Sequence, residues 1–271
     1  MLTKITSTFR ELYQNRKLLM TLAKNDFKTK YAGSYLGIIW AFVQPIITIL
    51  VYWFVFGNIF QTGSDRGAPY VLWLITGLVP WFFVQEGIVS GMNAFIEYNY
   101  LVKKVVFKIS ILPLVKVISA FAVNLFFIFF VLILYLAYGF VPDFYFLQIA
   151  YYAFCLFTLV VAVSYITSSI VVFFRDLNQI VNIVLQIGVW MTPIMWSFSD
   201  LNIDPNGKIA TLLKLNPVYY IVNGYRTSLI DKIGFWEFPA LSLYFWVVTL
   251  ALLIIGLLLF KKLKIHFADV L

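Results

Sequence analysis

The chain has 271 residues, of which 62% are hydrophobic and only 12% are charged, and its mean hydropathy is +0.92. A soluble domain of this size carries roughly a quarter charged residues, so the composition excludes an ordinary soluble protein and predicts an all-α integral membrane protein. The net charge is +8, but the basic residues are spread unevenly along the chain, so we expect no nucleic-acid partner.

Residues 1–32 are too polar to form a span and have the pattern of an amphipathic helix. Apolar residues recur at helical spacing, with basic residues between them. We therefore expect a cytoplasmic interface helix that lies on the membrane surface, and a solvated cytoplasmic helix is the alternative. The apolar positions are Ile5, Phe9, Leu12, Leu19, Ala23 and Phe27, and the basic positions are Arg10, Arg16, Lys17, Lys24 and Lys28.

The stretch from Asn25 to Pro45 leads into the first apolar run, which continues to Phe60. Gly33 and Gly37 allow the backbone to turn where a surface helix becomes a membrane span. An ordinary juxtamembrane linker is the alternative for these glycines. We expect residues 33–271 to form the transmembrane domain.

Six segments of that domain are long and apolar enough to be spans, since a bilayer core of about 30 Å needs roughly 20 apolar residues. With the N-terminus inside, fifteen of the 20 Lys and Arg residues fall on the cytoplasmic side. Lys and Arg are retained in the cytoplasm, so this asymmetry predicts a multi-pass protein of the cytoplasmic membrane with both termini in the cytoplasm. The segments are Gly37–Phe60, Val71–Val89, Val115–Tyr138, Phe146–Phe174, Ile180–Trp196 and Leu241–Phe260.

Two cytoplasmic connections are natural docking points for a partner protein. Residues 97–110 mix basic and apolar residues at roughly helical spacing, and residues 173–179 form a tight turn between two antiparallel spans. For the lysines, a solvated or lipid-phosphate-binding surface is the alternative. The candidate docking residues are Tyr100, Lys103, Lys104, Arg175 and Asp176.

The loop after Trp196 is too long for a tight turn, and its middle, residues 209–230, is apolar. Asn216 and Pro217 divide it, because proline disfavours helix at the preceding residue and lacks a backbone donor. Neither piece is long enough to span, so we expect a re-entrant helical hairpin on the extracytoplasmic side. A pair of surface helices is the alternative.

Several kinds of site are missing from the sequence. No Gly-x-x-x-x-Gly-Lys-Ser/Thr phosphate loop occurs, so we expect no ATP hydrolysis by this chain itself. The single histidine, His266, excludes histidine-based triads, and no Cys and His cluster has metal-ligand spacing, so we expect no catalytic residue and no metal. Glu86 falls within a span, where it faces a cavity or a partner or else lies near the inner interface; Lys116 is expected to snorkel to that interface.

Aromatic residues make up 20% of the chain, more than interfacial belts alone need. Aromatic faces suit sugars, whose CH-rich faces stack on rings, so part of this set is expected to line a sugar pathway. The alternative is that these rings face lipid. The candidates include Trp40, Trp81, Phe82, Trp190 and Trp196.

Short motifs follow one another in a fixed order along nearly the whole chain. This order resembles the ABC-2-type permeases of bacterial exporters for cell-surface polysaccharides. Its details are more similar to the wall teichoic acid exporters of Gram-positive bacteria than to the O-antigen exporters. The motifs are Asp26, Lys28, Tyr31, Ser34, Leu36, Gly37 and Trp40; Tyr52–Gly57; Phe173–Asp176; Thr192–Ile194; Leu215–Tyr220; Gly224–Arg226; and Phe267–Asp269.

The resemblance implies a homodimer of permeases with two separate ATP-binding cassette subunits, which bind the ATP and Mg²⁺. It implies a lipid-linked polymer as substrate and a channel between the two permeases, with residues 97–110 and 173–179 as coupling elements. Lys28 and Lys30 would receive the pyrophosphate headgroup, or would only obey the positive-inside rule. The implied pathway adds Lys28, Lys30, Tyr31 and Tyr35 to the aromatic residues above, and the implied extracytoplasmic gate is Asn216, Pro217, Tyr219, Tyr220, Tyr225 and Arg226.

Within the family, a permease for lipid-linked O-antigen or capsular polysaccharide is the alternative to teichoic acid export. A self-powered secondary transporter is a more distant alternative, and it predicts several buried ionisable residues near mid-membrane. A membrane-bound transferase predicts a conspicuous acidic or histidine-containing cytoplasmic loop. The sequence has neither feature.

Overall fold

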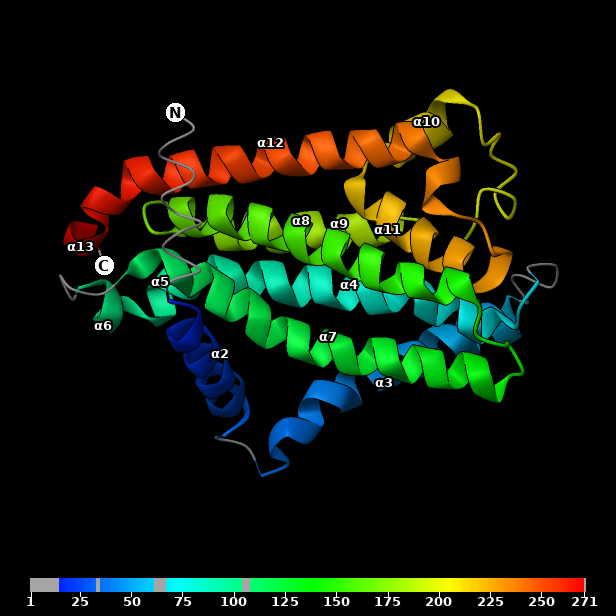
Figure 1. The fold of residues 1–271 in the computed structure, drawn as a ribbon, viewed down its shortest axis with the longest axis horizontal. Coiled ribbons are helices and arrows are strands. Elements are labelled where there is room, and N and C mark those ends of the chain that lie inside the picture. The colour runs from blue at the N-terminus through cyan, green and yellow to red at the C-terminus, as the bar shows by residue number, and fades with distance from the viewer. Residues whose placement is uncertain (1–14, 33–34, 61–66, 104–107, 271) are drawn as a thin grey trace.

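The computed structural model describes residues 15–32, 35–60, 67–103 and 108–270, except for the side chains of Tyr31 and Ala268. Within these ranges every regular element is a helix. Four long helices run along the molecule (Figure 1): α4 (Tyr70–Met92), α7 (Leu112–Ala137), α8 (Gln148–Val171) and α12 (Pro239–Leu263).

Helix α4 lies at the centre of the fold. A helix that is apolar on all sides is expected to be buried. In α4, 78% of the most apolar 18-residue stretch is buried, between α7, α8 and their neighbours. Two glycines let α8 approach closely. A Cβ atom on Gly87 would lie 2.6 Å from Val160, and one on Gly91 would lie 2.3 Å from the hydroxyl of Ser164.

Five helical segments in the described part of the chain are long and apolar enough to cross a membrane: Gly37–Ile59, Tyr70–Met92, Ile109–Ala137, Phe144–Val171 and Pro239–His266. Each overlaps a predicted span. The remaining predicted span, residues 180–196, forms α9 (Leu177–Met191), which has 15 residues and is shorter than a bilayer core requires. The helix stops because Thr192 is extended before Pro193. The sixth span therefore stays a prediction.

The first candidate span, Gly37–Ile59, is the least buried of the five, with 11% of its most apolar 18-residue stretch buried inside the protein. It consists of a 3₁₀ turn η1 (Gly37–Ile39), helix α3 (Trp40–Tyr52) and the π-helical η2 (Trp53–Ile59). Gly37 has a φ of +52°, which a residue with a side chain rarely adopts, so the predicted turn at this glycine is confirmed. Gly33 lies outside the described residues.

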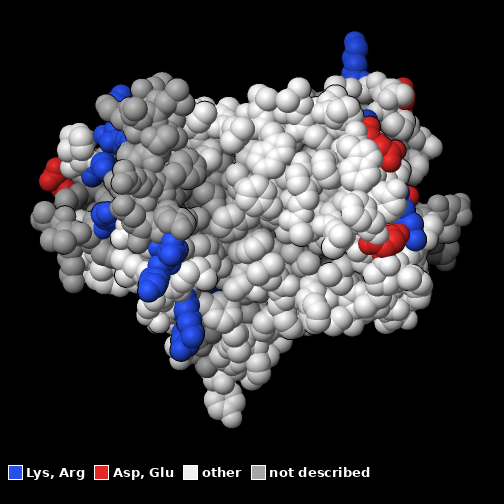
Figure 2. Space-filling model, viewed as in Figure 1, with Lys and Arg blue, Asp and Glu red and all other residues white. Residues whose placement is uncertain are grey.

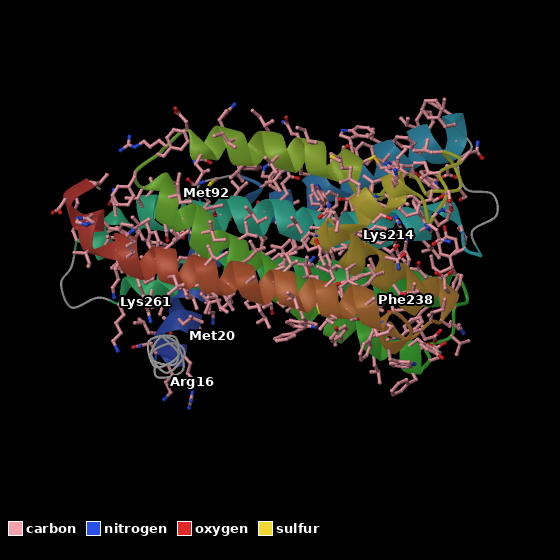
Figure 3. All side chains as sticks on the ribbon, turned by 90° about the horizontal axis from the view of Figure 1, so that it is seen from above. Arg16, Met20, Met92, Lys214, Phe238 and Lys261 are labelled. Carbon is pink, nitrogen blue, oxygen red and sulfur yellow. The ribbon has the colours of Figure 1, made fainter. Side chains whose placement is uncertain are left out.

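Both described ends of the chain lie at one end of the molecule, which we call the basic end (Figure 1). Lys and Arg gather there on the face shown in Figure 2, and the middle of that face is uncharged. In Figure 3, Arg16 and Lys261 lie at this end, while Lys214 and Phe238 lie at the opposite end. The basic end holds α2 (Arg16–Tyr31), α5 (Ala94–Glu97), α6 (Asn99–Val102), η7 (Lys264–His266) and α13 (Phe267–Val270).

Part of the predicted interface segment, Arg16–Tyr31, forms helix α2, and residues 1–14 lie outside the described residues. That this helix lies on the membrane surface stays a prediction. Residues 97–110 are predicted to form a coupling helix. In this stretch Tyr98, with φ −98° and ψ 30°, separates α5 from α6, and the 3₁₀ turn η3 (Ile109–Ile111) starts at its end. Residues 104–107 lie outside the described residues, and the coupling role stays a prediction.

The opposite end of the molecule carries the short connecting elements. The predicted break at Asn216 and Pro217 is confirmed, and whether the hairpin re-enters the membrane stays a prediction. These elements are η4 (Phe144–Leu147), α10 (Lys208–Lys214), α11 (Pro217–Arg226), the π-helical η5 (Thr227–Asp231) and η6 (Phe235–Glu237).

Candidate functional site

A groove of about 760 Å³ runs along α4 between α3 and α9. The lining residues of α4 extend from Leu78 to Val89, which corresponds to about 17 Å of helix. Helix α7 contributes to the floor through residues such as Asn124 and Phe127, and Lys30 of α2 reaches the groove at the basic end. The groove is therefore built from five separate helices.

Aromatic rings line both walls and the floor of this groove. Trp40 on α3 is 48% exposed and Trp190 on α9 is 54% exposed, whereas Trp81 on α4 is buried. A Cβ atom on Gly188 would lie 2.8 Å from the Trp81 ring, so the glycine lets α9 pack against α4 at this point. Phe82 also lines the groove. The structure thus brings four of the predicted aromatic pathway residues together, in the same groove as Lys30.

Amide side chains alternate with these rings. Gln44 on α3, Gln85 on α4 and Gln186 on α9 line the groove and are exposed in the isolated chain. Asn124 donates a hydrogen bond to the carbonyl oxygen of Val79 at 3.1 Å. Each amide both donates and accepts hydrogen bonds, so the groove offers sugar hydroxyls partners within an otherwise apolar belt.

At the basic end an ion pair crosses the groove. The ammonium group of Lys30 on α2 binds the carboxylate of Glu86 on α4, and both residues line the groove. Ser90, one turn further along α4, donates a hydrogen bond to the same carboxylate oxygen at 2.6 Å. Glu86 therefore faces a cavity and has a partner, and its position at the basic end also agrees with the interpretation that it lies near the inner interface.

A second charged cluster joins α2 to α7 and to the predicted coupling segment. The ammonium group of Lys116 lies 2.6 Å from Asp26 and 2.5 Å from Glu97, and the hydroxyl of Tyr98 donates to Asp26 at 2.8 Å. Burial, together with this hydrogen bond, raises the pKa of Tyr98 above its usual range. The prediction that Lys116 snorkels is wrong: the residue is 9% exposed, because two carboxylates compensate its charge inside the protein.

At the opposite end, residues of the candidate gate contact the turn that follows α9. Arg226 donates to the carbonyl oxygens of Pro193 and Ile194 at 2.5 and 2.8 Å, and its guanidinium lies 3.4 Å from the centre of the Trp73 ring. Asn216 caps α11 by accepting from the amide of Val218, an arrangement typical of the start of a helix whose first residue is proline.

The same Asn216 side chain donates to the hydroxyl of Thr192 at 2.8 Å. Helix α11 is therefore hydrogen-bonded at both of its ends to the turn that follows α9. Helix α9 in turn forms one wall of the groove. It also packs tightly against α8, since a Cβ atom on Gly224 would lie 2.1 Å from the Tyr152 ring. The remaining gate candidates, Tyr219, Tyr220 and Tyr225, are buried in this region.

The other predicted site residues lie outside the groove. Lys28 and Tyr35 are exposed and do not line it. Trp196 donates to the backbone of Trp190 at 3.0 Å but does not line the groove. The side chain of Tyr31 and all of Lys104 lie outside the described residues. The exposed coupling candidates, in α6 and in the turns after α6 and α8, are Tyr100, Lys103, Arg175 and Asp176.

Sequence reasoning missed the amides of the groove. They follow a helical pattern: Asn182 and Gln186 are four residues apart on α9, and Gln44 on α3 is followed four residues later by Thr48, which also lines the groove. A polar stripe at this spacing in an apolar helix marks one face and could have predicted it. Among the residues that the structure describes, no group of three or more His, Cys, Asp or Glu side chains is placed to hold a metal ion.

Comparison with known proteins assigns the class. The family model of ABC-2 type transporters matches residues 17–230, and the chain belongs to this family of membrane-embedded transporter subunits.

Named relatives narrow the comparison. The chain is 29% identical to the O-antigen export system permease protein RfbA of Myxococcus xanthus over 217 residues, which is 80% of this chain and 82% of the relative. It is 28% and 27% identical to two RfbA proteins of Klebsiella pneumoniae, over 94% of this chain and 95% of each relative. The predicted closer likeness to teichoic acid exporters is not supported by these relatives, which are named for O-antigen export.

Proposed function

We propose that this chain is the permease subunit of an ATP-driven transporter that exports a lipid-linked cell-surface polysaccharide of the O-antigen type across the cytoplasmic membrane. The observation that carries the proposal is the groove beside α4, in which aromatic rings and amides alternate within an apolar helical bundle. A polysaccharide needs both kinds of group along its path, since rings stack on sugar faces and amides bind hydroxyls. The names of the relatives agree with this substrate class.

A second copy of the chain completes the pathway. Gln44 and Gln186 are exposed on the open side of the groove, and in lipid they would have no hydrogen-bond partners. A partner that covers this side encloses them in a polar channel. Two grooves that face each other across a two-fold axis form a closed, self-complementary dimer, the commonest symmetry of soluble homo-oligomers.

Energy comes from two ATP-binding cassette subunits, which hold the ATP and Mg²⁺. They dock at the basic end, which faces the cytoplasm together with both termini. The exposed residues of α6 and of the turn between α8 and α9 form the docking surface. Near this surface the side chain of Asn178, at the start of α9, donates a hydrogen bond to the side chain of Asn93, at the end of α4, at 2.8 Å. This bond joins the docking surface to α9, which forms one wall of the groove. Motion of the cassettes therefore reaches α9 directly.

Substrate enters at the basic end and leaves beside α11. Lys30 receives the anionic diphosphate of the lipid carrier, because a lysine presents a compact charge that meets phosphate without one fixed geometry. At the exit, α11 is fixed to the turn after α9 by Asn216 and Arg226, so a displacement of the groove wall also moves the gate.

Reconstitution of the permease with its cassette subunit in proteoliposomes tests this function. A polyisoprenyl-diphosphate-linked glycan is supplied at the cassette side, and its ATP-dependent arrival at the other face is measured with an impermeant lectin. A lipid-linked polyol-phosphate polymer of the teichoic acid type serves as the competing substrate. We expect transport of the glycan in preference to the polyol phosphate. Preference for the polyol phosphate would restore the teichoic acid assignment, and transport of neither would overturn the proposed function.

A further inference from the structure

The ion pair between Lys30 and Glu86 is open to the groove. The side chains are 36% and 44% exposed, respectively, and both residues line the groove at its basic end. Exposed ion pairs of this kind contribute little to stability. The pair therefore lies at the basic end of the groove, within reach of an entering anion, without being sealed in the core.

Helix α2 does not depend on this pair for its position. Asp26 lies one helical turn before Lys30 on the same face of α2, and it is bound by the buried Lys116 and by the hydroxyl of Tyr98. Leu19 and other apolar residues of α2 also pack against η3 and α7. Breaking the contact with Glu86 consequently leaves Lys30 at the mouth of the groove.

The Glu86 carboxylate has a second hydrogen-bond partner, Ser90, in addition to Lys30. The hydroxyl of Ser90 donates to the same carboxylate oxygen that binds Lys30, at 2.6 Å, and both residues lie on α4. If the lysine turns to another anion, the carboxylate keeps a hydrogen bond and stays in the groove. The arrangement is thus an exchange site. The Lys30 ammonium group can bind either the Glu86 carboxylate or an incoming anion, and the Glu86 carboxylate can bind either Lys30 or Ser90.

We propose that Glu86 is an internal competitor for the substrate's headgroup. The lipid diphosphate enters by displacing the Glu86 carboxylate from Lys30, and the carboxylate remains on Ser90. This inference rests on the proposed function and concerns the regulation of the same site. Because a ligand has to displace a carboxylate, a diphosphate with several negative charges enters more readily than a monophosphate. The pair therefore selects the class of headgroup.

A merely structural ion pair makes a different prediction. If Lys30 and Glu86 only held α2 to α4, removing either partner would break the same contact and would change binding in the same direction. If Glu86 competes with the substrate, the two substitutions act in opposite directions. The sign of the effect separates the two roles.

The experiment uses the complete transporter in lipid nanodiscs, and the probes are a polyisoprenyl diphosphate and the matching monophosphate. We expect Glu86→Gln to bind the diphosphate roughly two- to fivefold more tightly, the size set by an exposed ion pair, and to discriminate less against the monophosphate. Lys30→Gln is expected to weaken binding, and the double variant to behave as Lys30→Gln does. Lys24→Gln, an exposed lysine on the same helix, is the matched control and is expected to bind as the unmodified protein does.

A second variant tests the same exchange without touching either charge. Ser90→Ala removes the alternative donor, so Glu86 stays on Lys30 and the diphosphate binds more weakly. If Glu86→Gln binds the diphosphate with unchanged or lower affinity, or if Ser90→Ala binds it as tightly as the unmodified transporter, the competitor role is wrong while the proposed function stands. If the unmodified transporter binds no lipid diphosphate at all, the proposed function fails and this inference fails with it.

Discussion

Replacing Lys116 by methionine should destabilise the protein, because it leaves the Asp26 carboxylate buried without a cation. The Lys116 and Asp26 side chains are 10% and 5% exposed, respectively. Removing one partner of a buried ion pair costs about 3–5 kcal/mol. The Glu97 side chain is 52% exposed and becomes hydrated when its partner is lost, so Asp26 alone carries the cost.

The size of the loss follows from the remaining contacts. The Tyr98 hydroxyl still donates to Asp26, so we expect the lower end of that range, about 3 kcal/mol. In a chain of this size that corresponds to a fall of roughly 6–12 °C in the midpoint of thermal unfolding. The measurement is thermal unfolding of the purified permease in detergent, and Lys262→Met, at an exposed lysine of α12, is the control.

A second substitution checks the cause. Asp26→Asn in the Lys116→Met chain removes the unpaired charge, so the double variant should recover a large part of the lost stability. A Lys116→Met protein that unfolds at the same midpoint as the Lys262→Met control would refute the reasoning. So would a double variant no more stable than Lys116→Met alone, because the buried charge would then not be the source of the loss.

Three other predictions concern topology, coupling and the gate. In a version without the native cysteine, Asn206→Cys should react with an impermeant thiol reagent added to intact cells and Lys262→Cys should not; labelling at Lys262 would contradict the orientation. Charge reversal at both Arg175 and Asp176 should leave the permease inserted but lower its stimulation of the cassette's ATP turnover, and unchanged assembly, turnover and export would remove this turn from the docking surface. Gly224→Ala should cost about 1–3 kcal/mol of stability and impair export, since the new methyl group meets the ring that packs on α11; a fully active, equally stable variant would show that the gate helix adapts.

The sequence by itself determined the class of the fold. In a lipid bilayer the backbone N–H and C=O groups of a long apolar run have to form hydrogen bonds within the protein, so such runs are predicted to be helices. The positions of these runs along the sequence located the five candidate spans. Local chemistry also fixed several boundaries. The break before Pro217 and the turn at Gly37 follow from the backbone restrictions of single residues.

Pairing of charges was decided only by the tertiary structure. Nothing local distinguishes Lys116 from a lysine that snorkels to the interface, because its partners, Asp26 and Glu97, belong to other elements. The same holds for Glu86, whose partner Lys30 lies 56 residues away. A sequence shows which residues carry charge, but not which charges the packing of helices brings together.

The groove depends on packing in the same way. The sequence named Trp40, Trp81 and Trp190 as aromatic residues without separating those that face a cavity from those that face lipid, since an apolar helix presents rings on all sides. Packing of α3 and α9 beside α4 selected the face that is shared, and it added the amides to it. The sequence therefore determined the membrane class and its helices, whereas the groove exists only where separate helices place their polar stripes against one another.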